Sequence, residues 1–559
     1  MIGKLLVQDF ASEHKWEFIA YICLIVAFFP IEGILLPKVY GQLFEKVKTL
    51  ASFNDIYNWK ENMSKMNFPG AMVVLILLWG LVILSYSAKN YIESLLIPSY
   101  FSYLRDIIFK NTVKTYLHDY SDVKTGDYLA RVLELTRNFK DLFQHVLSRF
   151  IPEFTVSVLI ILYMFYQNKT IGTILLIGSI ICGIIQYFGA HELIKLITDR
   201  ETFFNVKLSE NIRDSLDNLM NIFLNNEVDS ELKKNNDIEK VATSKLRHIM
   251  FVQNIVVIIS QIIVLITFAT SIIYLYYLIT TGDIKVTHGI VLVIILGQYL
   301  NNFLYVNSGF VHNIVYKLGV INTSKEYLNN IFSPKISRTL NKGITNGTIE
   351  FRNMYFKYNK TDNDWLFEDF NLELEAGGKY AIIGQSGRGK TTLMKMLAGL
   401  YTPTKGAIYI DDVDVKHLDL TYLRNNVNYV NQRTNMFNES VMYNMLYGNP
   451  DATEEQAIAI LKKHDLLTIF DELEDGLNSN AGIQGGNLSG GMQRITILIR
   501  GLLKSCKIIV LDEPTTGLDP NSSGKVKQMI VEETDGKTLI IITHDVSLSL
   551  LSGITKVSL

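Results

Sequence analysis

The sequence has 559 residues, which is long for one compact domain, so two or three folding units are expected. Its charges almost cancel, with 53 lysines and arginines against 55 aspartates and glutamates and a formal net charge of −2. This balance gives no support for a broadly basic surface, and we therefore expect no nucleic-acid partner. Hydrophobic residues make up 48% of the chain, and they gather into long runs before residue 310.

The N-terminal half contains six stretches that are long and apolar enough to cross a bilayer, which takes about 20 residues in a helix. These stretches cover about residues 18–36, 71–88, 154–166, 171–188, 249–279 and 289–304. The first stretch could also be a signal peptide, but no small-residue cleavage site follows it. We therefore predict six membrane spans, in contact with membrane lipid.

Long polar segments separate some of these spans. Residues 100–146 and 191–248 are polar, keep a helical period and contain few glycines or prolines. This pattern predicts that the membrane helices continue far beyond the bilayer before they turn back. Two inserted soluble helical hairpins are the alternative, which the lack of breakers disfavours.

The character of the sequence changes near residue 335. Strand-like alternation appears at 348–351 and 372–374, after a polar stretch at 341–346. We therefore predict a six-helix transmembrane domain over residues 1–335, a linker over 336–347 and an α/β domain over 348–559. The three cysteines, Cys23, Cys182 and Cys506, have no metal or redox spacing, so neither a zinc site nor a disulfide framework is indicated.

A glycine-rich loop in the second domain indicates a phosphate site. A buried strand at 380–383 precedes it and a helix-forming run at 393–400 follows, which is the setting that a P-loop requires. Glycines let backbone N–H groups converge on phosphate oxygens, and Lys390 would reach the β- and γ-phosphates while Thr391 would bind Mg²⁺. The predicted nucleotide-binding residues of this loop are Gly384, Gln385, Ser386, Gly387, Arg388, Gly389, Lys390, Thr391 and Thr392.

Two acidic residues follow a second buried strand. Asp512 and Glu513 come after the apolar run at 508–511, and carboxylates at the carboxyl end of such a strand lie where open α/β sheets bind ligands. Asp512 suits Mg²⁺, either as a direct ligand or as a residue that holds one of the ion's ligands, and Glu513 could act as general base towards water. For an isolated Asp-Glu pair, an exposed turn would be the ordinary interpretation, but the P-loop upstream and the buried strand before the pair favour a ligand-binding role.

P-loops occur in many unrelated NTPases, so the class of NTPase must be inferred from other residues. The informative motif is Leu488-Ser489-Gly490-Gly491, just upstream of this strand. The motif resembles the signature of ATP-binding cassettes, and the chain as a whole resembles six-span half-transporters of the exporter type, among them multidrug, lipid and peptide exporters. The resemblance implies an α-helical membrane domain plus an α/β P-loop NTPase cassette. It also implies that Ser489, Gly490 and Gly491 contact the ATP of a second cassette, so that a second half-transporter, the same or a related chain, is the partner.

The same resemblance implies roles for four further residues. Tyr358 resembles the aromatic that stacks on adenine, although an isolated tyrosine in a strand more often only packs. Gln432 resembles the loop glutamine that binds Mg²⁺ and water, and Asp519 the aspartate that crosses the dimer interface. His544 resembles the histidine that holds the γ-phosphate, so Glu513, His544 and Gln432 are the predicted catalytic set.

The membrane half resembles the family less specifically. Residues 125–129 and 214–221 fall where exporters carry their first and second coupling helices. The loop at 481–486 lacks the Glu-Arg charges common in exporters, which leaves open how the cassette couples to those helices. Polar residues along the fifth and sixth spans, among them Gln298, Asn302 and Asn307, could line a cavity or bond between helices, and the sequence does not decide.

The expected function is therefore export of an unidentified small or amphipathic substrate, driven by ATP hydrolysis, by a dimer of half-transporters with ATP and Mg²⁺ as cofactors. Even span parity puts both termini on one side of the membrane, and the C-terminal half must meet cytosolic ATP, so we expect both termini and the cassette on the cytosolic side. An ATP-gated channel or regulatory membrane sensor on the same scaffold is the alternative. Glu513 and His544 argue against it, because sites that do not hydrolyse commonly lose one of these residues.

Overall fold

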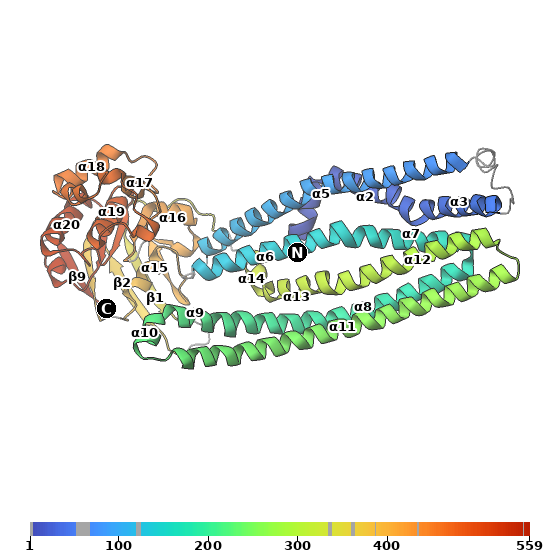
Figure 1. The fold of residues 1–559 in the computed structure, drawn as a ribbon. Coiled ribbons are helices and arrows are strands. Elements are labelled where there is room, and N and C mark those ends of the chain that lie inside the picture. Colours follow the sequence, from blue (N-terminus) through green and yellow to red (C-terminus); the bar gives the residue numbers. More distant parts are fainter. Residues whose placement is uncertain are drawn as a thin grey trace. The chain divides into compact units, whose positions relative to one another are not determined.

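The computed structural model describes residues 4–51, 68–118, 125–333, 338–358, 364–385, 387–432, 435–551 and 553–559. It divides into two compact units (Figure 1). One unit comprises the helices up to Ser333 except for residues 113–122, which group with the second unit, Pro334–Leu559. The predicted linker, 336–347, starts inside the gap at 334–337, so its bounds stay a prediction.

The regular elements of the first unit are all helices over its described residues. Its elements are η1 (Lys4–Gln8), α1 (Asp9–Glu13), α2 (Lys15–Pro30), η2 (Ile31–Leu35), α3 (Leu36–Ala51), α5 (Phe68–His118), α6 (Thr125–His145), η4 (Val146–Phe150), α7 (Ile151–Gln167), α8 (Lys169–Phe203), η5 (Phe204–Leu208), α9 (Ser209–Asp217), α10 (Leu219–Leu224), α11 (Val228–Thr280), α12 (Val286–Gly309), η6 (Phe310–Val315), α13 (Tyr316–Thr323) and α14 (Lys325–Ile331).

Six helical runs in this unit are long and apolar enough to cross a membrane, which confirms the predicted number of spans. They are Lys15–Glu45, Gly70–Leu117, Val132–Gln167, Lys169–Asp217, Val228–Thr280 and Val286–Thr323. At 1.5 Å per residue, the 53 residues of α11 extend about 80 Å, whereas a bilayer core is about 30 Å thick. The spans therefore continue as helical extensions, and inserted hairpins are excluded for the described part of this unit.

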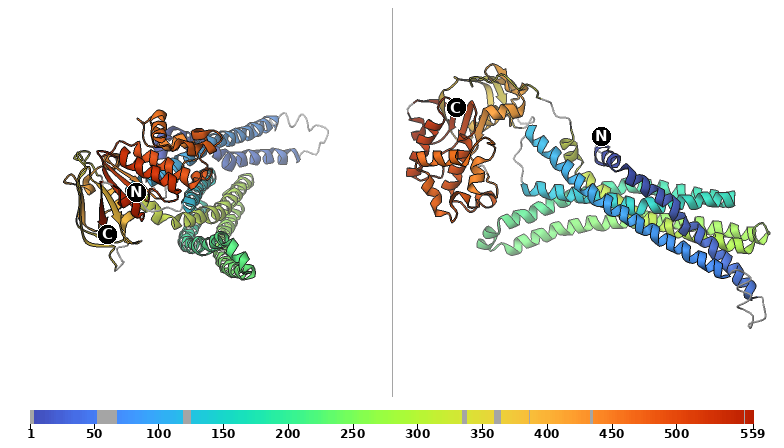
Figure 2. Two further views of the ribbon diagram at one scale, coloured as in Figure 1. Left: turned by 90° about the vertical axis from the view of Figure 1, so that its left-hand side faces the viewer. Right: turned by 90° about the horizontal axis from the view of Figure 1, so that it is seen from above.

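The helices α8 and α11 lie side by side along most of their length (Figures 1 and 2). Gly178 on α8 permits this approach, since a Cβ there would lie 2.2 Å from the Thr267 Oγ1 on α11. Small residues at such contacts are typical of helices that pack within membranes. The segment predicted as one helix, 214–221, is instead broken at Asn218, whose side chain donates back to the Asp214 carbonyl at 2.9 Å.

The second unit has two sheets. The antiparallel one has the order β2-β1-β4-β5 and the parallel one the order β6-β7-β8-β3-β9. The strands are β1 (Ile349–Phe356), β2 (Phe367–Leu374), β3 (Lys379–Ile383), β4 (Lys405–Ile410), β5 (Val413–Asp414), β6 (Val427–Val430), β7 (Ile508–Asp512), β8 (Thr538–Ile542) and β9 (Ile554–Ser558).

Helices and short helical turns connect the strands of this unit. They are α15 (Lys390–Leu397), η7 (Val415–His417), α16 (Leu420–Asn426), α17 (Val441–Leu446), α18 (Glu454–Lys463), η8 (Leu467–Glu472), η9 (Gly476–Asn478), η10 (Ile483–Gly485), α19 (Gly490–Leu502), α20 (Pro520–Glu533) and α21 (Val546–Ser549). The strands β7 and β8 are buried along their full length. Because β7, β8 and β3 are parallel neighbours, their carboxyl ends meet at one edge, where such sheets bind ligands.

Candidate nucleotide-binding site

The loop after β3 turns sharply into helix α15. Gly387 and Gly389 both have φ of +85°, in the left-handed region that favours glycine. At Gly389 a Cβ would also lie 2.7 Å from the Phe367 ring, so no larger residue fits there without movement. The loop therefore brings the first N–H groups of α15 to the sheet edge, as a phosphate site requires. Of the predicted loop residues, Ser386 lies outside the described part of the chain.

Lys390 places a buried cation under this loop. The residue is 6% exposed, and its Nζ donates to the Gly384 carbonyl at 2.7 Å and the Gln385 carbonyl at 3.1 Å. The same Nζ lies 3.5 Å from His544 Nε2. Carbonyl oxygens carry no net charge, so they leave the positive charge of the ammonium available to an anion.

Two oxygen groups meet beside the loop. The Thr391 hydroxyl donates to Asp512 Oδ2 at 2.9 Å, and Asp512 is 2% exposed. The Tyr429 hydroxyl donates to the same Oδ2 at 3.0 Å. A hydroxyl and a carboxylate in contact are the hard oxygen donors that Mg²⁺ prefers, so these residues fit that ion.

Glu513 is held at the end of β7 by neighbouring donors. Its Oε1 accepts from the His544 backbone N–H at 3.0 Å, and its Oε2 accepts from the Thr516 hydroxyl at 3.1 Å. The His544 ring Nε2 lies 3.8 Å from the same Oε1. The backbone of Glu513 has φ of +50°, a left-handed conformation that is uncommon for a non-glycine residue. A carboxylate fixed in this way can accept a proton from a nearby water.

These groups line one cavity of about 700 Å³. Tyr358 stands at its rim, 60% exposed, with its hydroxyl 2.5 Å from Thr392 Oγ1. The cavity is lined by Tyr358, Leu366, Gly387, Arg388, Gly389, Lys390, Thr391, Thr392, Gln432, Asp512, Glu513, Thr516, Ile542 and His544. The structure thus brings together most of the predicted nucleotide, metal and catalytic residues.

Ser489, Gly490, Gly491 and Asp519 are not among the residues that line this cavity. Each begins or caps a helix instead. The Ser489 hydroxyl accepts from the Met492 N–H at 3.3 Å at the start of α19. Asp519 accepts from two backbone N–H groups at the start of α20, and hydrogen bonds from the Ser522 side chain and backbone lower the pKa of the Asp519 carboxyl.

Tyr429 and Thr516 also contact the acidic residues of the site and were not predicted from the sequence. Tyr429 sits on strand β6, where an aromatic residue indicates core packing, so no sequence signal distinguished its bond to Asp512. Thr516 lies three residues after Glu513, a spacing at which a turn folds a side chain back onto its neighbour. The three-residue spacing could therefore have predicted the contact between the Thr516 hydroxyl and the Glu513 carboxylate.

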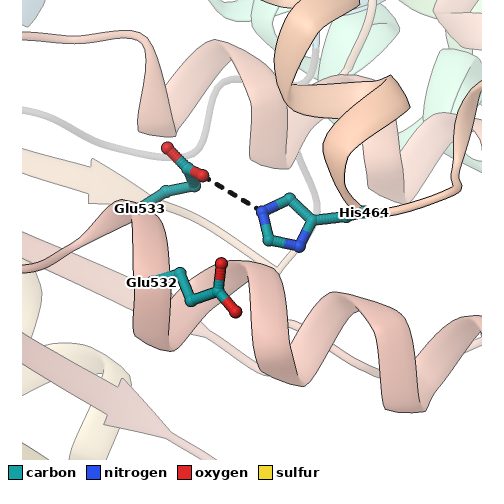
Figure 3. Close-up of side chains that lie close together, drawn as sticks. All are labelled: His464, Glu532 and Glu533. Atoms are coloured by element: carbon teal, nitrogen blue, oxygen red, sulfur yellow. Dashed lines mark hydrogen bonds and ion pairs between the residues drawn. The ribbon is translucent and has the colours of Figure 1, made fainter.

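A second cluster of titratable groups lies between α18 and α20, where His464 faces Glu533 (Figure 3). The His464 Nε2 is 3.0 Å from Glu533 Oε1. Lys463 Nζ already lies 2.7 Å from Glu533 Oε1 and 3.2 Å from Glu532 Oε2. Because a lysine neutralises both carboxylates, this cluster is an ion-pair network that joins two helices rather than a metal site.

Comparison with known proteins places these features in a family. Residues 19–303 match the family model described as "ABC transporter transmembrane region", and residues 367–516 match the one described as "ABC transporter". A "Putative export ATP-binding/permease protein" of Rickettsia typhi is 25% identical over 483 residues, which is 83% of this chain and 79% of the relative. "ABC transporter B family member 2" of Dictyostelium discoideum is 34% identical over 211 residues, and that match spans only 15% of the relative.

A solved structure of a bacterial Atm1-family ABC exporter with ATP bound is similar in fold. The TM-score is 0.78 with 18% sequence identity, over 97% of this chain and 93% of that one. Fold and site together define a P-loop ATPase cassette joined to a six-span membrane region. The family model of the membrane region alone matches residues 19–303, which is more than half of the 559 residues. The chain therefore belongs to the ABC transporters, in the half-transporter arrangement of the exporter type.

Proposed function

We propose that this chain pairs with a second copy or a related chain and exports a small or amphipathic molecule, with ATP hydrolysis as the driving reaction. One observation carries the proposal. A single cavity holds a P-loop lysine, a Mg²⁺-type oxygen pair and a fixed glutamate, in a chain that also has six membrane-spanning helices. The proposed orientation puts the cassette and both termini on the cytosolic side.

The cavity residues divide the work of phosphoryl transfer. Lys390 and the N–H groups of the loop hold the β- and γ-phosphates, and Tyr358 packs on adenine. Thr391, Asp512 and Gln432 would hold Mg²⁺, which would neutralise charge on the phosphates when bound. Glu513 accepts a proton from the attacking water, and His544 lies beside the γ-phosphate. Fixed charges and donors of this kind supply most of the stabilisation in such reactions.

We infer a second cassette because four residues that were predicted to bind nucleotide lie outside the cavity of this chain. Ser489, Gly490, Gly491 and Asp519 would then act on the ATP held by the partner, each site being built from one P-loop and the opposite signature. This arrangement supports a pair of half-transporters. The same cavity supports a pump over an ATP-gated channel, since a gate requires nucleotide binding but no positioned general base.

Two adjoining cavities in the membrane unit support an amphipathic cargo. Each has a volume of about 440 Å³, and they share Phe150, Val306 and Phe310. One is also lined by charged and polar groups such as Arg149 and Glu153, whereas the other is almost entirely apolar. Polar and ionisable groups at a cavity within membrane helices commonly mark a substrate path.

The composite site can be tested by trapping nucleotide in the full chain in lipid nanodiscs. Glu513→Gln should retain about one ATP per chain after rapid desalting, because binding and closure remain while hydrolysis fails. Adding Ser489→Arg to that variant should release the ATP, although Ser489 lies outside the cavity of its own chain. Retention of ATP by the double variant would contradict the paired site.

Transport itself needs a vectorial assay. In proteoliposomes with outward-facing cassettes, the chain should accumulate a fluorescent amphiphile against its gradient only with ATP and Mg²⁺. Dissipative flux that merely follows the gradient, with ATP binding sufficient, would instead establish the gated channel.

A further inference from the structure

A buried arginine lies on helix α19, behind the hydrolytic end of the cavity. Arg494 is 5% exposed, and the residues that follow it, Ile495–Ile499, are buried and mostly apolar. Burying a guanidinium is expensive unless its donors are satisfied. Such a residue among apolar neighbours therefore requires a specific explanation, and it is also a signal that can be read from sequence.

The Arg494 guanidinium donates to five backbone carbonyls. Nε donates to Pro514 at 3.1 Å, and Nη1 donates to Gln432 at 3.2 Å and to Asn431 at 3.4 Å. Nη2 donates to the carbonyls of Asp512 and Glu513. None of these acceptors is a side-chain carboxylate, so the bonds fix backbone and leave the acidic groups of the cavity free.

The five carbonyls belong to the two segments that carry the acidic and amide groups of the cavity. The carbonyl of Asp512 precedes the Glu513 Cα, and that of Glu513 follows it, so Arg494 holds the peptide groups on both sides. Glu513 has φ of +50°, and such left-handed backbone is strained for a non-glycine residue and persists only where surrounding structure enforces it. Arg494 supplies that enforcement, and its bond to the Gln432 carbonyl fixes the second segment relative to the first.

We propose that Arg494 is a positioning residue for ATP hydrolysis, which keeps the Glu513 carboxylate aligned through the backbone on either side of it. The inference rests on the proposed role of Glu513 as general base. It extends that role, because Arg494 lies five residues after Ser489 at the start of the same helix. A shift of α19 at the signature end would therefore reach the general base of the same cassette through one side chain.

Helix α19 also offers a matched control. Arg500 lies on the same helix, donates to the Asn444 carbonyl at 2.6 Å and to Asn444 Oδ1 at 2.9 Å, and supports α17. It is absent from the residues that line the nucleotide cavity. A merely structural role for Arg494 would make the two arginines equivalent in their effects.

The test compares Arg494→Lys with Arg500→Lys in the full chain in nanodiscs. An ammonium is a point charge and cannot span five carbonyls as a planar guanidinium does. Arg494→Lys should therefore lower kcat about 10- to 100-fold, the loss expected from misplacing a reacting group by about 1 Å, while KM for ATP stays within about twofold. Both variants should lower the unfolding temperature by similar amounts, because each weakens hydrogen bonds of a half-buried or buried arginine. Arg500→Lys, however, should leave kcat within about threefold of wild type. A kcat loss in Arg494→Lys no larger than in Arg500→Lys would overturn the proposal.

A double variant separates this proposal from the function on which it rests. If Arg494 acts through Glu513, adding Arg494→Lys to Glu513→Gln should leave the residual hydrolysis rate unchanged. Multiplicative losses would show that Arg494 acts independently and would overturn the inference, with the role of Glu513 intact. Wild-type hydrolysis in Glu513→Gln alone would instead refute the proposed function.

Discussion

Each of the two units buries a lysine close to polar partners, but the partners differ in charge. In the membrane unit, Lys89 Nζ lies 2.7 Å from Glu93 Oε1, so the ammonium is neutralised by a carboxylate. In the cassette, Lys390 Nζ donates to two backbone carbonyls and lies 3.5 Å from His544 Nε2. The first charge is already paired, whereas the second is solvated by dipoles and stays available to a ligand.

The partners of Glu93 explain what the membrane cluster does. The Tyr21 hydroxyl donates to Glu93 Oε1 at 2.9 Å, and the Ser148 hydroxyl donates to Oε2 at 2.9 Å. Those residues come from α2 and η4, so one carboxylate on α5 joins three segments of the bundle. A buried charge that is satisfied on all sides specifies packing, and a buried lysine without a carboxylate indicates a binding site.

The largest expected effect falls on the cassette. Glu513→Gln removes the proton acceptor but keeps the shape of the side chain, so hydrolysis should fall about 10²- to 10⁴-fold while ATP still binds. Phosphate release and fluorescent-nucleotide binding measure the two properties separately. Glu532→Gln, a change in the ion-pair network between α18 and α20, should leave turnover near wild type and serves as the control.

A comparable effect, on stability instead of turnover, is expected in the membrane unit. Glu93→Ala would leave the Lys89 ammonium buried without a carboxylate, with the Ser148 carbonyl at 3.3 Å still accepting from it, and breaking a buried ion pair in this way costs about 3–5 kcal/mol. Thermal unfolding in nanodiscs would report this loss. Lys89→Met combined with Glu93→Leu should recover most of the stability, since no charge then remains buried. An unfolding temperature of Glu93→Ala equal to that of wild type would show that the Lys89–Glu93 cluster does not stabilise the packing of the helices.

A smaller effect is expected at Thr516. Thr516→Val removes one hydrogen bond to a Glu513 oxygen, worth about 1 kcal/mol, so kcat should fall about fivefold. Thr516→Ser keeps the hydroxyl and should retain most of the activity. Equal losses in both variants would mean that the methyl group, rather than the hydroxyl, supports the site.

The smallest effect lies one residue beyond His544. Burial alone would raise the pKa of Asp545, but hydrogen bonds from Lys527 and Ser547 outweigh it and lower the pKa to about 2. A lowered carboxyl pKa stabilises the fold above the unfolded value near 4, and this contribution is lost as the pH falls from about 4 to 2. Asp545→Asn should therefore unfold more easily than wild type at pH 7, and the gap should close towards pH 2. A constant gap would exclude titration of Asp545 as its source.

The features that sequence predicted are those encoded over short stretches of chain. Apolar runs located all six spans. The glycine-rich loop predicted the helix that follows it, and the apolar run before Asp512-Glu513 predicted the buried strand that carries this pair. Tyr429 and Asp512 are 83 residues apart, and Tyr21 and Glu93 are 72 residues apart. Which side chains meet over such separations depends on how elements pack, and no local pattern records it. The break at Asn218 was missed for a related reason, because helical periodicity continues across it.

The Ser489 cap has a consequence for repeated turnover. A hydroxyl accepts through its lone pairs and donates its proton at the same time. In the proposed pair, Ser489 would therefore keep its bond from the Met492 N–H while it donates to a phosphate oxygen of the second cassette's ATP. On that proposal, each closing and opening of the pair would leave the end of α19 intact, so the helix would not have to be rebuilt in every cycle. Aspartate would cap this helix equally well but would repel the phosphate, and serine is the residue that serves both states.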